Sequence, residues 1–229
     1  MARILHDLTA AGDRRFSPYC WRTKLALAHK GLAYETRALR FIDIDGLSGG
    51  PRLTLPTLDD GDRRITDSWK IALHLENAYP DAASLFPSGR EVARFAQAWT
   101  NIQVNPALIR VILLDVFKAL DPADQPYFRE SREARFGMTL EAFAGDRAAA
   151  LDRFRAALQP IRDVLGDQPF LAGAQPAYAD YAPASAFLWA DAIGQGDLLA
   201  PGDPVGPWLA RVTAVLGDDA GLDSGAISA

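Results

Sequence analysis

The chain has 229 residues, of which 49% are hydrophobic and 23% charged. This is enough for one large or two small domains with the composition of an ordinary soluble globular protein. The formal net charge of -5 and the lack of a basic run argue against nucleic acid or an anionic membrane as partner. Residues 1–10 lack the apolar core of a signal peptide, and no stretch reaches the length of a membrane span, so we expect a cytoplasmic protein.

The opening of the chain predicts a strand, a helix and a second strand. Residues 4–8 form a short apolar run, and residues 34–39 alternate in a strand-like way. Between them, Ser17 is a favoured N-cap and Pro18 a favoured first helical residue, so a helix is expected over residues 17–30. Alone, this Ser-Pro pair indicates an ordinary helix start, although a hydroxyl there also lies beside the positive end of the helix dipole, where anions bind.

The next segment predicts a hairpin and a helix. After a glycine-bearing connection over residues 43–54, the Asp60-Gly61 pair lies between two short β-prone runs, which is typical of a two-residue hairpin turn. Pro56 stands at the first residue of the first run, a position that allows a cis peptide bond after Leu55. A helix is expected from about residue 67 to residue 79, where a proline follows.

The remainder of the chain carries only helical patterns. Residues 80–89 hold two prolines, two serines and a glycine. This indicates a linker over residues 81–89 between a first domain over residues 1–80 and a second over residues 90–229. Pro106 is expected to kink the first of the later helices. The helices are expected over residues 91–118, 148–165 (continuous despite Pro160), 177–193 and 207–216.

The order of these elements resembles the glutathione transferase family, over nearly the whole chain. Ser17-Pro18-Tyr19-Cys20 looks like a thioredoxin-fold active-site motif whose first thiol has become a hydroxyl. The resemblance implies a thioredoxin-like βαβ-ββα domain followed by an all-helical domain, and thus a fold of class α/β plus all-α. One departure is Ala177, which stands where the helix-start motif of the family has a Ser or Thr cap; losing such a cap costs about 1 kcal/mol.

Within the family, the chain is most similar to bacterial glutathione-dependent β-aryl etherases and to their fungal relatives. The likeness is spread over both domains and implies an aromatic substrate held in an apolar pocket between them. It rests on Ser17-Pro18-Tyr19, Trp21-Arg22-Thr23-Lys24, Asp67-Ser68-Trp69, Ser131-Arg132-Glu133, Asp180-Tyr181, Phe187-Leu188-Trp189 and Trp208.

The resemblance implies a glutathione site whose parts have physical reasons. Asp67 and Ser68 at a helix start would hold the zwitterionic γ-glutamyl end, because the Ser68 N–H and hydroxyl suit the carboxylate and the Asp67 carboxylate suits the ammonium. Leu55, before the cis Pro56, would offer its backbone N–H and C=O to the cysteinyl part. Taken singly, each pair reads as a plain cap or turn. Together, and in this order, they favour the functional interpretation.

Other residues are less decisive. For the glycine carboxylate of glutathione, Arg52 ranks only weakly above Arg40, since a loop arginine is usually a solvated charge. Cys20 is expected to be a small buried group, because thiol exchange would begin with the first thiol of the motif, which this chain lacks. The three histidines show no metal-ligand spacing, so no metal is expected.

The reaction expected from the resemblance is attack of a glutathione thiolate on a hydrophobic aromatic electrophile. Ser17 is expected to stabilise the thiolate through its hydroxyl and not to act as a nucleophile. The family also implies a homodimer. Two alternatives stay open at this point: a glutathione-dependent thiol reductase or peroxidase using Cys20, and a non-catalytic glutathione-binding or scaffold module.

Overall fold

The first part of the chain is a four-stranded sheet with two helices. The computed structural model describes residues 2–47 and 54–217. The strand order is β2-β1-β3-β4, with β1 parallel to β2 and antiparallel to β3, and with β3 antiparallel to β4. This confirms the predicted βαβ unit and hairpin. The elements are β1 (Arg3–Leu8), the short turn η1 (Ala11–Asp13), α1 (Pro18–His29), β2 (Glu35–Leu39), η2 (Phe41–Leu47), β3 (Thr57–Asp60), β4 (Arg63–Thr66) and α2 (Ser68–Ala78).

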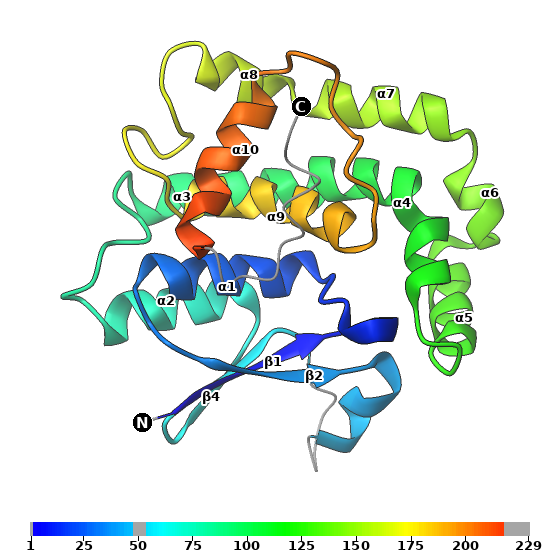
Figure 1. The fold of residues 1–229 in the computed structure, drawn as a ribbon, viewed down its shortest axis with the longest axis horizontal. Coiled ribbons are helices and arrows are strands. Elements are labelled where there is room, and N and C mark those ends of the chain that lie inside the picture. The colour runs from blue at the N-terminus through cyan, green and yellow to red at the C-terminus, as the bar shows by residue number, and fades with distance from the viewer. Residues whose placement is uncertain (1, 48–53, 218–229) are drawn as a thin grey trace.

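The second part of the chain is helical throughout its described length, ending at residue 217. Figure 1 shows α9 crossing the middle of this part, with α1 of the sheet domain directly below it. Every residue of α9 except three near its C-terminal end is buried, so this helix is the centre of the core. The elements are α3 (Arg90–Trp99), η3 (Thr100–Val104), α4 (Asn105–Ala119), α5 (Gln125–Phe136), α6 (Leu140–Ala144), α7 (Arg147–Ala157), α8 (Gln159–Leu165), α9 (Tyr178–Ala192), α10 (Val205–Thr213) and η4 (Ala214–Leu216).

Two prolines interrupt helices in different ways. Before Pro106 the chain forms one π-helical turn, η3, closed by the Asn105 N–H bonding to the Thr100 carbonyl. This turn accommodates the proline, which has no N–H to donate, and it divides the long helix predicted over residues 91–118 into α3 and α4. The continuous helix predicted over residues 148–165 was wrong. It breaks at Leu158, and Pro160 lies in the first turn of α8, where a missing N–H leaves no hydrogen bond unmade.

The start of α9 is held by a buried carboxylate. Ala177 has no side-chain oxygen and so cannot cap the helix. Asp180 instead accepts hydrogen bonds from the N–H groups of Ala177 at 3.2 Å, Leu171 at 2.7 Å and Ala172 at 3.1 Å. The Trp208 indole of α10 donates a fourth bond to it at 2.9 Å. Asp180 therefore joins the start of α9 to the segment before it and to α10.

The two parts of the chain meet along α1 and α9, which run in opposite directions. The Nε of Arg22 donates to the Ser185 hydroxyl at 3.1 Å. Two turns later in α1 and about one turn earlier in α9, His29 and Tyr181 share a hydrogen bond of 2.6 Å. All four residues lie on the facing sides of the two helices. Polar bonds thus fix the register of this interface, which is otherwise apolar.

Candidate glutathione site

Strand pairing brings the segments predicted for the site to one end of the sheet. Strand β1 pairs with β3 so that His6 lies opposite Thr57, and β3 pairs with β4 so that Thr57 lies opposite Thr66. Pro56 and Asp67 are the next residues on these two strands, and the Asp67 N–H donates to the Pro56 carbonyl at 3.2 Å. Strand β1 also ends there and leads through a short loop into α1.

Ser17 is the N-cap of α1, as predicted. Its backbone is extended, and its Oγ accepts the Cys20 N–H at 3.4 Å. The side chain is almost fully buried. Accepting through a lone pair leaves the hydroxyl proton available for a second partner, and the remaining N–H groups of the first turn point the same way. The site can therefore stabilise an anion.

Cys20 lies in a different electrostatic setting. The side chain is buried, and burial together with the negative Asp7 raises the pKa of the Cys20 thiol well above its usual range. Asp7 itself is fully buried and is paired with the Lys24 ammonium at 2.6 Å and with Arg15 at 3.4 Å. A thiol in this place stays protonated, which agrees with the small buried role expected for it.

Asp67 and Ser68 form the start of α2. One oxygen of Asp67, Oδ1, accepts the N–H groups of Trp69 at 3.0 Å and Lys70 at 3.1 Å, which leaves Oδ2 for another donor. Asp67 is exposed and has a φ of 79°, a conformation that non-glycine residues rarely adopt. Such strain costs roughly 1–3 kcal/mol and concentrates at functional sites. Ser68, in contrast, is buried.

The peptide bond between Leu55 and Pro56 is cis, as predicted. Leu55 is half-buried at the beginning of the hairpin, next to the cap of α2. The following Thr57 hydroxyl donates to the Thr54 carbonyl at 2.9 Å and so fastens the turn on its other side. The backbone of Leu55 is thus held between two hydrogen-bonded residues, where a peptide ligand could pair with it.

The structure describes one of the two arginines predicted as candidates for binding the glycine carboxylate of glutathione. Arg52 lies outside the described residues. The Arg40 guanidinium is paired with Asp43 and with Asp121, each at 3.4 Å, across the contact between η2 and the segment that follows α4. These two carboxylates already neutralise Arg40, so its geometry favours a structural role.

Arg22 and Tyr178 are two buried polar groups near the cap of α2 that the sequence did not single out. The Nη1 and Nη2 atoms of Arg22 are buried without a hydrogen-bond partner among the described residues, and the buried hydroxyl of Tyr178 lies near Ser68. Burial lowers the pKa of the Arg22 guanidinium, while Tyr178, Tyr19 and Asp67 act on it in the opposite direction. Burial raises the pKa of Tyr178 to about 12, although Arg22 and Ser68 oppose this shift, so its hydroxyl stays protonated.

A sequence signal for these two residues exists but is indirect. Arg22 lies between Trp21 and Thr23 on a helix with hardly any exposed position, so the helix cannot turn it toward solvent. Tyr178 is the first residue of the central helix α9. Neither fact reveals that the two meet, because their proximity depends on how α1 and α9 pack.

Among the described residues, the site therefore combines a helix-start hydroxyl, the Asp67 Oδ2 and the Leu55 backbone without a partner, and buried Arg22 donors without partners. These features fit a small zwitterionic peptide with a thiol, because each charged end finds an opposite charge or a dipole. Within residues 2–47 and 54–217, no cluster of three His, Cys, Asp or Glu side chains is arranged to hold a metal ion, and no helix has the length and apolar character to span a membrane.

Comparison with known families gives a consistent result for both parts of the chain. Residues 16–78 match the model of the glutathione S-transferase N-terminal domain, and residues 92–198 match that of the glutathione S-transferase C-terminal domain. The two matched ranges together cover most of the chain and contain Ser17, Leu55-Pro56 and Asp67-Ser68.

Individual relatives are similar over comparable lengths. The glutathione S-transferase-like protein ustS of Aspergillus flavus is 26% identical in an alignment 207 residues long that covers 77% of this chain and 75% of that protein. The crystal structure of glutathione transferase GSTFuA3 from Phanerochaete chrysosporium has a TM-score of 0.83 and 25% identity, covering 94% of this chain and 97% of that one. The glutathione complex of CsGST63524 from Ceriporiopsis subvermispora has a TM-score of 0.79 and 24% identity, covering 94% and 96%. With its thioredoxin-like sheet domain and helical second domain, the chain belongs to the glutathione S-transferase family.

Proposed function

We propose that the protein is a glutathione transferase in which Ser17 stabilises the thiolate of glutathione for attack on a hydrophobic aromatic electrophile. The observation that carries the proposal is the convergence of the α1 cap, the cis-proline turn and the α2 cap at one end of the sheet. One of the similar structures, that of CsGST63524, was determined with glutathione bound. A glutathione thermal shift gives the first check, since ligand at 10 times its Kd adds about 1.4 kcal/mol of stability.

Each residue of the site has a proposed part in binding. Asp67 holds the γ-glutamyl ammonium with its free Oδ2, and the buried Ser68 offers its backbone N–H and hydroxyl to the carboxylate. Leu55 pairs with the cysteinyl backbone from the turn before Pro56. Arg52 remains our candidate for the glycine carboxylate, because Arg40 is already paired with two carboxylates.

The proposed part of Ser17 follows from the energy that thiol ionisation requires. A free thiol with a pKa near 8.5 is about 3% ionised at pH 7, and a pKa of about 6.5 raises this fraction to roughly 75%. A shift of two units corresponds to about 2.7 kcal/mol. One hydrogen bond to a charged group supplies about 1.5–3 kcal/mol and a helix N-terminus about 0.3–1 kcal/mol, so the cap of α1 suffices.

We propose an α-keto β-aryl ether as the electrophile. Attack by the thiolate forms a carbon–sulfur bond at the carbon next to the carbonyl, and the carbon–oxygen bond breaks to release an aryloxide. A phenol has a pKa near 10, so the departing oxygen needs no strong general acid. Tyr19, two residues after Ser17, is exposed and presents an aromatic ring for such a substrate.

A substrate panel tests this choice. Purified protein with glutathione is expected to release phenol from α-keto β-aryl ethers, measured by chromatography, and simple aryl halides serve as the reference electrophiles. Turnover of the halides without cleavage of any keto ether would leave a general transferase and remove the etherase activity.

The alternative of a thiol reductase or peroxidase using Cys20 finds no support in the geometry. The thiol is buried, and burial and Asp7 raise its pKa, whereas a reactive cysteine needs an exposed and easily formed thiolate.

We also propose that the protein is a homodimer joined through the outer face of α3 and η3. Val92, Phe95 and Ile102 are exposed there, with 47%, 76% and 68% of their surfaces accessible, and their spacing places them on one face. Exposed apolar residues that cluster in this way typically mark an interaction surface.

Phe95→Glu is expected to yield monomers at micromolar concentration in light scattering, because a charge would be buried against the partner copy. Met138→Glu is the matched control, since Met138 is also exposed but lies outside this face. A monomeric wild-type protein, or a dimeric Phe95→Glu variant, would refute this interface.

A further inference from the structure

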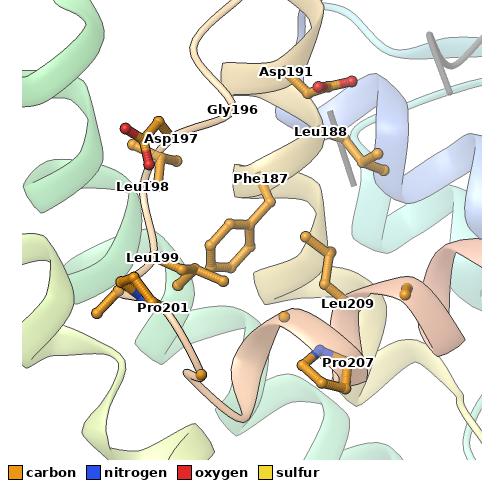
Figure 2. Close-up of a pocket in the computed structure, with 14 residues that line it drawn as sticks. Phe187, Leu188, Asp191, Gly196, Asp197, Leu198, Leu199, Pro201, Pro207 and Leu209 are labelled. Atoms are coloured by element: carbon orange, nitrogen blue, oxygen red, sulfur yellow. The ribbon is translucent and has the colours of Figure 1, made fainter. Parts of the chain in front are cut away.

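The C-terminal half of α9, the segment 196–202 and α10 enclose a pocket that contains no residue of the sheet domain. Its volume is about 600 Å³, within the range of pockets that hold small molecules. Figure 2 shows the Phe187 ring reaching into the space between the segment 196–202 and α10, with Leu199 and Leu209 beside it. Three glycines leave room in the walls: Gly196, Gly202 and Gly206.

The wall of this pocket is fixed from behind. Arg155 of α7 donates from Nε to the Leu198 carbonyl at 2.9 Å and from Nη2 to the Leu199 carbonyl at 3.3 Å. Arg162 of α8 pairs with Asp203 at 2.7 Å, and Asp203 in turn accepts the Val205 N–H at the start of α10. These bonds fix the segment 196–203 to α7 and α8, so the pocket is preformed, which reduces the entropy lost when a ligand binds.

The ionisable side chains that line the pocket are acidic. Among the described residues that line it, Asp191 and Asp197 are the only ionisable side chains, and Figure 2 shows both at the upper edge of the pocket. The arginines that fix the wall are engaged with carbonyls and with Asp203, and Asp203 already caps the start of α10. The exposed Asp197 therefore disfavours a carboxylate-bearing ligand such as glutathione at this rim.

Charge complementarity at the rim indicates which kind of ligand the pocket favours. Residues 218–229 contain three aspartates and no Lys, Arg or His. Further negative charge is unfavourable beside the exposed Asp197, so complementarity favours a cationic molecule.

We propose that this pocket is a second binding site, separate from the glutathione site, for a small aromatic amine. The apolar ring packs against Phe187, Leu199 and Leu209, and the protonated amine lies at the rim near Asp197. The pocket is built by α9 and α10 alone together with the segment between them, so binding there does not require glutathione.

Three probes with the same naphthalene ring test the proposal by calorimetry on the full chain without glutathione. 1-Naphthylmethylamine is expected to bind with a Kd of about 0.1 mM or tighter, given its size. The neutral 1-naphthylmethanol is expected to bind about threefold more weakly and 1-naphthoic acid more weakly still, since an exposed charge pair contributes at most about a fivefold factor.

Two variants locate the binding. Asp197→Asn is expected to reduce the preference for the amine over the alcohol, whereas Asp167→Asn, an exposed neutralisation outside the pocket, is expected to keep it. A Cβ on Gly206 would point at Leu199 Cδ1, 3.8 Å away, so Gly206→Phe fills the pocket and is expected to weaken all three probes at least tenfold. Glutathione turnover is expected to stay unchanged in both pocket variants, which separates this site from the proposed function.

Four results would overturn the proposal. They are equal binding of the amine and the acid, an amine preference that survives Asp197→Asn, displacement of the amine by saturating glutathione, and amine binding that appears only after residues 218–229 are removed. The last result would make the chain's own terminus the occupant. Because Asp197 is exposed, its variant folds even if Gly206→Phe does not.

Discussion

Replacing Asp180 by alanine is expected to lower the free energy of unfolding by about 4 kcal/mol. The fully buried carboxylate accepts hydrogen bonds from the Leu171, Ala172 and Ala177 N–H groups and from the Trp208 indole. Each donor left unpaired in the interior costs about 1–3 kcal/mol, and the packing around the lost side chain adds to this. A domain of ordinary stability, about 5–15 kcal/mol, would lose a large part of it.

Urea unfolding followed by circular dichroism measures this loss. The matched control is Asp167→Ala, because Asp167 is exposed and makes no side-chain hydrogen bond within the described residues, so its removal is expected to change stability by less than about 0.5 kcal/mol. Equal stabilities of the two variants would show that Asp180 does not organise the start of α9.

Ser17→Ala is expected to lower turnover about tenfold or more at pH 7 and to recover most of that loss at pH 9. Without the hydroxyl the thiol pKa returns toward 8.5, so the thiolate fraction at pH 7 falls from roughly 75% to about 3%. At pH 9 the thiol ionises without help. Affinity for glutathione is expected to change little, because Asp67, Ser68 and Leu55 carry the proposed binding contacts.

Steady-state kinetics from pH 6 to 9 test this prediction, with Tyr19→Phe as the matched control. The Tyr19 hydroxyl is the nearest alternative donor along the chain, and removing it is expected to leave the pH profile intact. Ser17→Ala also removes a helix cap worth about 1 kcal/mol, so its folding is checked separately. Full activity of Ser17→Ala at pH 7 would place the activating donor elsewhere.

Much of the sheet domain could be predicted because its signals are local. Each of three residue pairs determines the backbone around it: Ser17-Pro18, Asp60-Gly61 and Asp67-Ser68. The strands and helices next to these pairs begin and end within one or two residues of the predicted positions. The helical domain depends more on packing. Pro106 follows a π-helical turn, whereas the helix before Pro160 ends and a new one begins after Leu158. Nothing in the sequence of either helix distinguishes these two outcomes.

The candidate site likewise has a part that local sequence signals predict and a part that depends on packing. Its caps and cis-proline turn are visible in the sequence. The buried Nη1 and Nη2 atoms of Arg22 and the hydroxyl of Tyr178 are not, since they come together only when α1 packs on α9. Helices α5 and α6 also escaped prediction. Helix α5 has only one buried residue, Phe128, so it lacks the apolar face that periodicity detects.

The pKa of the thiol in bound glutathione tests the central claim most directly. It is measured by titrating the ultraviolet absorbance of the thiolate in complexes of glutathione with the wild-type protein and with Ser17→Ala. The account predicts a pKa of about 6.5 in the wild-type complex and a value near 8.5 in the variant. The same pKa in both complexes would contradict it, because Ser17 would then have no part in forming the thiolate.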